Sequence, residues 1–166
     1  WQKTEDGTNW TNITAANSDS YQPGVLIKTT YFRKRVTSAS IDDYTNIVTV
    51  TVHDNFIPGV IGADQTVCNN DIPASLNSTS LPSGGNGAYT NQWKSSLNSS
   101  SWTVLTGATD SYYEPTALTV KTYFKKVVTD LCGVKETNVV TINVNLVFIP
   151  GTIGNDQTIL FNTIPQ

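Results

Sequence analysis

The sequence contains no methionine, one histidine and two cysteines, and charged residues occupy only 14% of its 166 positions. About a quarter is usual for a globular domain. The net charge is −3, which argues against nucleic-acid binding. The nearest basic cluster is Arg33-Lys34-Arg35, and on a strand these three side chains point to alternating faces and form no continuous patch. No apolar run approaches the roughly 18 residues that span a bilayer, so we expect no membrane insertion. His53 stands alone, which leaves a histidine-based catalytic or metal site without partners, and we expect no catalytic residues, no cofactor and no enzyme activity.

The most informative feature present is an internal repeat. Residues 56–66 read FIPGVIGADQT and residues 148–158 read FIPGTIGNDQT, which makes nine of eleven positions identical at an offset of 92. Residues 1–74 aligned on residues 93–166 share about 31 identities without a gap. A period of this length suits one small domain per repeat.

The chain starts inside a repeat, because Trp1 aligns with Trp93. Together with the absence of methionine, this leads us to expect an excerpt of a longer protein. The expected domains are the C-terminal portion of a first immunoglobulin-like repeat at 1–56, a complete repeat at 57–147 and the start of a third at 148–166.

Alternating residues predict strands. In 138–144, Val140 and Ile142 alternate with polar residues, which is typical of a strand with one buried face. We predict its counterpart at 48–52 and a hairpin loop at 131–135. Further strands are expected at 65–68, 74–79, 89–97, 101–105 and 122–129. About seven short strands per repeat predict an all-β fold, with tandem immunoglobulin-like antiparallel β-sandwich modules of about 92 residues.

The repeated Phe-Ile-Pro-Gly lies between the last strand of one module and the first of the next. Proline fixes φ and glycine permits a sharp turn, so we expect Phe and Ile to pack on the neighbouring module and to stiffen the connection. The partial repeats at both ends leave strand edges open. Two interpretations are open: the segment belongs to a longer assembly of repeats, or homo-assembly occurs by strand complementation between chains.

Three sets of residues are candidate sites. Cys68 and Cys132 form a disulfide if the protein is exported, with two buried free thiols as the alternative. Asp64 and Asp156 recur just after the linker and either cap a turn or coordinate Ca²⁺. Four aromatic residues are candidates for stacking on glycans if their rings are exposed: Trp10, Trp102, Tyr21 and Tyr112. The alternative is that these rings pack in the core or at a sheet edge.

Several short motifs occur together along the chain. They are Tyr89 to Trp93 (YTNQW), Trp102, Gly107 to Thr109 (GAT), Tyr113 to Pro115 (YEP), Thr122 to Val128 (TYFKKVV), Cys132, Asn138 to Thr141 (NVVT) and Ile153 to Thr158 (IGNDQT). This combination resembles the tandem immunoglobulin-like or PKD-like repeats of giant Bacteroidota cell-surface adhesins, including gliding-motility adhesins and other type IX secretion cargo. The resemblance implies export, an extracellular location at the cell surface and a stalk without catalytic residues. The family's cysteine pair is matched by Cys68 and Cys132, whereas the aligned Ser40 and Leu160 depart from it.

Three functions remain in competition. The leading one is a structural stalk repeat of a long secreted adhesin or filament, which spaces a distal tip from the cell and bears load. The second is a glycan- or protein-binding module that uses exposed aromatic rings. The third is an accessory domain of a secreted enzyme. The expected partners are neighbouring repeats of the same chain, with surface glycans as a further candidate.

Overall fold

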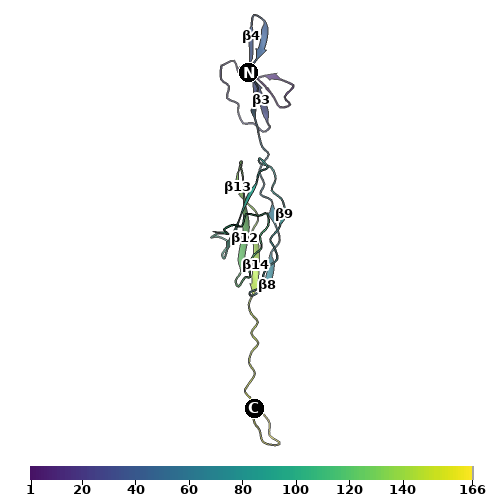
Figure 1. Cartoon of the computed structure of the whole chain (residues 1–166), viewed down its shortest axis with the longest axis vertical. Coiled ribbons are helices and arrows are strands. Elements are labelled where there is room, and N and C mark those ends of the chain that lie inside the picture. Colours follow the sequence, from purple (N-terminus) through teal and green to yellow (C-terminus); the bar gives the residue numbers. More distant parts are fainter. Residues whose placement is uncertain (166) are drawn as a thin grey trace.

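The computed structural model describes residues 1–165 and shows an all-β chain in which that range contains strands and no helix (Figure 1). This confirms the expected all-β class. Accordingly, none of the described residues belongs to a helix with the length and apolar character to cross a membrane. Gln166, the last residue of the expected third repeat, lies outside the described residues.

Strand pairing divides the described chain into two bodies and an extension. We call residues 1–55 the first module, 56–146 the second module and 147–165 the tail. The first module contains β1 (Gln2–Thr4), β2 (Thr11–Asn12), β3 (Thr30–Arg33), β4 (Arg35–Ser38), β5 (Ile41–Tyr44) and β6 (Val48–Val50). They form a sheet in the order β2-β1-β3-β6 and a separate β4–β5 hairpin, all antiparallel.

The second module is larger and contains two layers. Its strands are β7 (Val60–Ile61), β8 (Gln65–Cys68), β9 (Ser78–Ser80), β10 (Thr90–Ser96), β11 (Thr103–Val104), β12 (Thr122–Asp130), β13 (Gly133–Glu136) and β14 (Val140–Asn145). One layer is the sheet β11-β10-β12-β14-β8, with β13 paired to β12, and the other is built around the β7–β9 pair. This arrangement is consistent with a β-sandwich.

One pairing departs from the expected antiparallel pattern. β14 pairs with β8 in parallel, with Ile142 opposite Gln65 and Asn145 opposite Cys68. A second expectation was wrong at the predicted 131–135 loop, where the chain turns tightly after Asp130 and returns as β13 along β12. The Gly133 to Glu136 segment shows no alternation because it lies at an exposed edge of the sheet.

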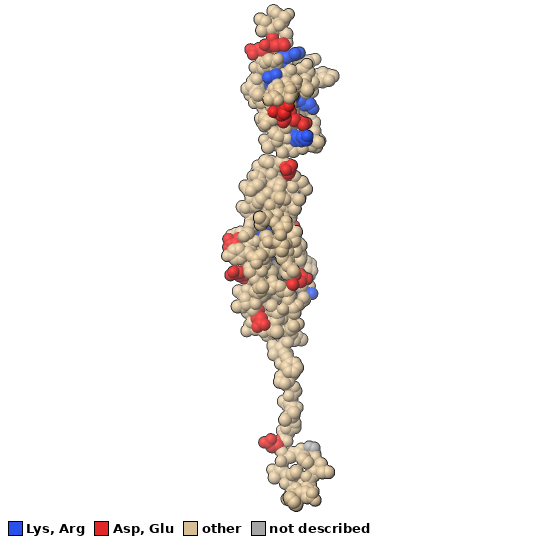
Figure 2. Space-filling model, turned by 90° about the vertical axis from the view of Figure 1, so that its right-hand side faces the viewer, with Lys and Arg blue, Asp and Glu red and all other residues tan. Residues whose placement is uncertain are grey.

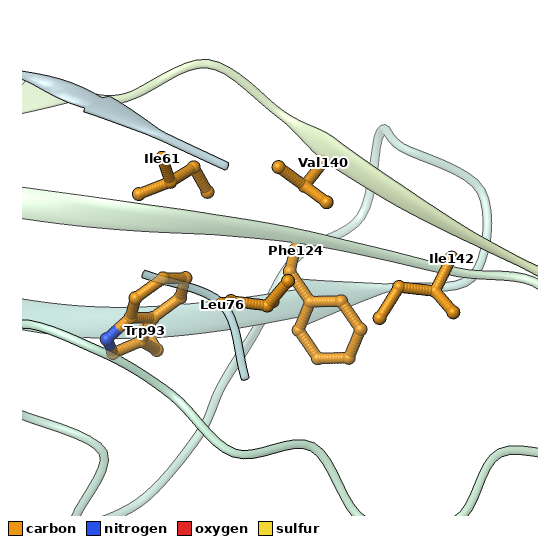
Figure 3. Close-up of a cluster of buried hydrophobic side chains, with 6 residues drawn as sticks. All are labelled: Ile61, Leu76, Trp93, Phe124, Val140 and Ile142. Carbon is orange, nitrogen blue, oxygen red and sulfur yellow. The ribbon is translucent and has the colours of Figure 1, made fainter. Parts of the chain in front are cut away.

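The core of the second module lies between its two layers. Ile61 and Leu76 from the small layer meet Trp93, Phe124, Val140 and Ile142 from the large sheet, and all six are buried (Figure 3). The Trp93 side chain is 0% exposed and its indole Nε1 donates a hydrogen bond to the Asp110 carbonyl at 3.0 Å. This bond satisfies the one polar atom of the ring, as burial requires.

The same aromatic arrangement occurs in both modules. The ring centroids of Trp93 and Tyr113 lie 5.8 Å apart, and those of Tyr113 and Phe124 lie 5.7 Å apart. In the first module the counterparts Trp1, Tyr21 and Phe32 lie at 6.1 and 6.0 Å. Sequence repetition is therefore matched by a repeated core.

A side-chain turn closes the β1–β2 hairpin of the first module. The Asp6 carboxylate accepts hydrogen bonds from Thr4 Oγ1 at 2.6 Å and from the backbone amides of Thr8 and Asn9 at 2.8 and 2.7 Å. These bonds favour the charged form and hold the pKa of Asp6 below its usual range, Thr4 contributing most. Asn98 makes the equivalent turn in the second module through its Oδ1.

Candidate functional site at the module junction

The repeated Phe-Ile-Pro-Gly is built into the module that it precedes. The Phe56 ring is 3% exposed and stacks on Tyr89, with centroids 5.8 Å apart and planes 14° from parallel. Ile57 exchanges two backbone hydrogen bonds with Ser83, at 2.8 and 3.0 Å. The Lys135 ammonium donates to the Phe56 carbonyl. The linker is therefore held by three segments of the second module.

Two glycines allow this close packing. Gly59 has φ of +78°, and a Cβ built on it would lie 2.4 Å from the Ser80 carbonyl oxygen. Gly84 has φ of +70°, and its Cβ would lie 2.1 Å from the Asn55 carbonyl oxygen. Both positions require a left-handed backbone and leave no room for a side chain, so glycine is needed at each.

Asp130 holds the loop before β10, which packs on the linker, in place through hydrogen bonds. Its carboxylate accepts hydrogen bonds from the Asn86 amide at 3.0 Å and from the Cys132 amide at 2.8 Å. The Tyr89 hydroxyl donates to the Gly84 carbonyl at 2.6 Å, and the Gly85 amide donates to the Asp54 carbonyl at 2.9 Å. Linker, loop and the β12–β13 hairpin therefore form one packed unit.

After the linker, the chain is fastened to β14 and to the residues just before it. Asn138 accepts a hydrogen bond from the Ile61 amide at 2.8 Å and donates one to the Ile61 carbonyl at 3.0 Å. The Asp64 carboxylate accepts from the Thr141 amide at 2.7 Å. We call the contacts of Asn138 and Asp64 the clasp. β8 follows directly and pairs with β14.

The clasp gives Asp64 a structural role in the second module. Asp156, its counterpart in the tail, is exposed. Among residues 1–165, His, Cys, Asp and Glu side chains form no group of three that would hold a metal ion. Calcium binding near Asp64 and Asp156 therefore stays a hypothesis without a ligand cluster to support it.

Cations cover two of the four aromatic candidates. The Arg33 guanidinium lies 4.1 Å from the Trp10 ring centroid and 3.9 Å from that of Tyr44. In the second module the Lys125 ammonium lies 4.1 Å from the Trp102 ring centroid. Each tryptophan therefore has one ring face occupied by a cation from a strand of the same module.

The other two candidates lie in different surroundings. Tyr21 is half-buried and packs between Trp1 and Phe32, which agrees with the alternative of core packing. Tyr112 is 45% exposed and lines a shallow groove with Asp110 and Glu114. Its counterpart in the first module is Ser20, so the repeat does not preserve an aromatic ring there.

The expected disulfide is contradicted by the register of the sheet. Cys68 lies at the end of β8 that is level with Asn145, whereas Cys132 lies in the turn at the far end of β12. β12 rises about 26 Å between Thr122, opposite Ile142, and Asp130, so the two cysteines are about 30 Å apart or more. A disulfide needs Cα atoms within about 7 Å. Both thiols are free and exposed, so the alternative of buried thiols was also wrong.

The sequence did not reveal which residues of the second module hold the linker and the segment that follows it. Asn138, Lys135 and Asp130 carry most of the polar contacts of the junction, and none stands out as a motif. Asn138 was detectable, because Asn46 stands at the equivalent position within the repeated Thr-Asn that precedes β6 and β14. Lys135 was not, since Asp43 replaces it in the other repeat.

Charge on the molecule is scattered. On the face in Figure 2, Lys and Arg lie mainly over the first module, interspersed with Asp and Glu, and they form no continuous basic patch. Phosphate binding relies on such a patch, and nucleic acid is not among the partners that we propose.

Comparison with family models matches the chain twice, over residues 1–54 and 57–146. The chain belongs to the family described as a domain of unknown function (DUF8696). The break between the two matches falls at residues 55–56, where the second module begins. A comparison with curated proteins finds no match.

Proposed function

We propose that the chain is a structural stalk segment of a long secreted cell-surface adhesin or filament, in which repeated modules give reach and bear load and perform no catalysis. Support comes from the two family matches in series, the repeated core and the linker embedded in the following module. The modules lie one after the other along the longest axis, and the tail leaves the second module at the end opposite the first module (Figure 1).

The observation that carries the proposal is the parallel pairing of β8 with β14. β8 is near the start of the second module and β14 is at its end, so tension along the chain reaches both strands. Because the strands run in the same direction, pulling the start of β8 and the end of β14 in opposite directions slides them past each other. The hydrogen bonds from Gln65–Ile142 to Cys68–Asn145 are then loaded together, in shear, and not one at a time.

Single-molecule stretching of residues 1–166 from both ends tests this proposal. Unfolding of the second module should appear as one force peak with a contour-length gain of about 30 nm, from roughly 90 residues at about 3.5 Å each. Val67→Pro disrupts β8 within the loaded pair and should lower the peak force strongly. Val104→Pro in β11, at the opposite edge of the sheet, is the control and should leave the peak force near its original value.

An unfolding peak that responds equally to both substitutions would contradict a load path through β8 and β14. We do not propose glycan stacking as the main role, because the cations over Trp10 and Trp102 already occupy one face of each ring.

A further inference from the structure

The loop before β10 contains Asn86-Gly87, the one place in the sequence where glycine directly follows asparagine. In such a pair the main-chain nitrogen of the glycine can attack the side-chain carbonyl carbon of the asparagine, because glycine has no side chain that obstructs the approach. Gly87 has φ of +79°, and a Cβ built on it would meet nothing within 4 Å. The surroundings of the attacking nitrogen are therefore open.

The Gly87 amide is not engaged in a hydrogen bond. In the part of the chain that the structure describes, no group accepts from it, whereas the amides of Asn86 and Ala88 on either side both donate. All three residues are exposed to solvent. Water can therefore take up the amide proton, and no native hydrogen bond has to break before the nitrogen attacks.

The Asn86 side-chain oxygen is held by two backbone amides. The Ala88 amide donates to Oδ1 at 3.3 Å, and the Leu131 amide donates to it at 3.4 Å. Attack on the carbonyl carbon places negative charge on this oxygen. Two N–H groups that already point at Oδ1 stabilise that charge, as the donors of an oxyanion hole do. Both bonds are long in the ground state and shorten as the charge develops.

We propose that Asn86 is a site of spontaneous deamidation that the folded loop promotes. The Gly87 nitrogen forms a bond to Asn86 Cγ and loses its proton to water, while the bond from Cγ to Nδ2 breaks and ammonia leaves after taking up a proton from water. Water then adds to a carbonyl carbon of the resulting cyclic imide and opens the ring, which leaves aspartate or isoaspartate at position 86. No electrons are transferred, and the inference goes beyond the stalk proposal because only the loop and water are needed.

The one aspartate that is followed by glycine, Asp6, shows what opposes the same ring closure. Gly7 has φ of +76° and surroundings as open as those of Gly87. The Asp6 carboxyl, however, stays charged, because its hydrogen bonds, that from Thr4 first, lower its pKa. A carboxylate is a poor electrophile and has no ammonia to lose. Of the two pairs, Asn86-Gly87 is the one arranged to react.

Deamidation introduces a negative charge beside Asp130. The Asn86 amide donates to the Asp130 carboxylate at 3.0 Å, and Asp130 is 9% exposed. A second carboxylate next to it is repelled, and burial weakens the screening by water. Isoaspartate also adds a methylene to the main chain, which moves Gly85 away from the Asp54 carbonyl that its amide binds at 2.9 Å. Both products therefore loosen the contact between the loop and the linker.

Peptide mapping of the native chain after storage tests the reaction. Residue 86 should be modified before Asn98, the internal control, which is also exposed and also accepts two backbone amides but is followed by serine. The rate should rise about tenfold per pH unit, because the attacking nitrogen must lose its proton. It should be at least as high in the native chain as in urea, where the two amides no longer hold Oδ1. A slower native rate, or equal modification at Asn98, overturns the proposal.

Two variants test the effect on the junction. Asn86→Gln keeps the amide and the net charge but reacts slowly, because its longer side chain must close a larger ring. Asn86→Asp carries the charge of the product from the start. Hydrogen exchange at the amides of Ile57, Ser83 and Gly85 should be about tenfold faster in Asn86→Asp, and in the stored original chain, than in Asn86→Gln.

Equal exchange in the two variants would overturn the effect on the junction. Storage that speeds exchange in Asn86→Gln as much as in the original chain would overturn Asn86 as the cause. Neither outcome bears on the stretching experiment, so failure of this inference and failure of the stalk proposal are separate results.

Discussion

Gly59 offers a sharp test of the junction, because the sequence supplies its own control at Gly151. Both glycines occupy the same place in the repeated Phe-Ile-Pro-Gly. Gly59 has φ of +78°, and backbone atoms of Ser80 and Leu81 lie 2.4 to 3.0 Å from the position that a methyl group would take. Nothing lies within 4 Å of the same position on Gly151. Alanine should therefore be harmful at the first position and harmless at the second.

The cost of Gly59→Ala has two parts. A left-handed backbone costs alanine about 1–2 kcal/mol. The backbone must also move away from the Ser80 carbonyl, which disturbs the β7–β9 pairing that begins at Val60 and forfeits about one hydrogen bond, or about 1 kcal/mol. The sum is about 2–3 kcal/mol, a large share of the roughly 5–15 kcal/mol that stabilises a typical domain.

Urea denaturation followed by tryptophan fluorescence measures this cost. Replacing Trp1 and Trp10 by phenylalanine leaves a signal from the second module. With a slope of about 1–1.5 kcal/mol per M, the midpoint of Gly59→Ala should fall by about 1.5–3 M. A shift below about 0.5 M, or an equal shift for Gly151→Ala, would refute the account of the junction.

Three further outcomes are expected. Alkylation of the native protein without reductant should add two groups, one each at Cys68 and Cys132, and intact mass checks this; a gain that appears only after reduction would restore the disulfide. Because the pKa of Asp6 is lowered in the folded state, its contribution to stability is present above the usual carboxyl pKa of about 3.8 and is lost as the pH falls towards the folded-state value. The thermal unfolding temperature should therefore fall between about pH 4 and 2, and Asp6→Asn should reduce this dependence on pH. Asn138→Ala leaves two backbone groups without partners and should lower the free energy of unfolding, measured in urea, by about 2 kcal/mol. Asn46→Ala, at the equivalent position of the first module, is the control and should change it by less than about 0.5 kcal/mol.

Strand positions were readable from the sequence where one side of the strand is buried. The alternation in 138–144 and the predicted 65–68 and 122–129 segments correspond to β14, β8 and β12. Burial of one face gives β14 a period of two, whereas β12 is buried at consecutive positions and was predicted together with its repeated counterpart at 30–37. β13 was missed because it is exposed at an edge and its residues carry no such period.

Partner choice was not readable, because strand pairing depends on contacts far apart in the sequence. The parallel β8–β14 pair joins residues 77 positions apart, and no local sequence pattern indicates whether such a pair is parallel or antiparallel. The error over Cys68 and Cys132 has the same origin. Two cysteines within one repeat suggest a bond, but only the register reveals that they lie at opposite ends of the sheet.

The position of the strongest repetition now has a physical reason. The nine shared residues of the Phe-Ile-Pro-Gly segment lie where the chain enters a module, and in the second module they form the linker contacts, the clasp and the start of β8. β14, which receives the clasp and β8, ends at Asn145, three residues before Phe148 begins the next copy of the segment. Tension would therefore pass from linker to clasp to β14 and on to the following linker. Trp102, with its cation, lies beside β11 at the opposite edge of the sheet from β8, off this line, and Trp10 lies beside β2 at the equivalent edge of the first module. Around these two residues the repeats differ more freely, because only five of residues 1–20 are identical to their counterparts at 93–112. If the proposed stalk function is right, accurate repetition is needed along that line and variation is tolerated beside it.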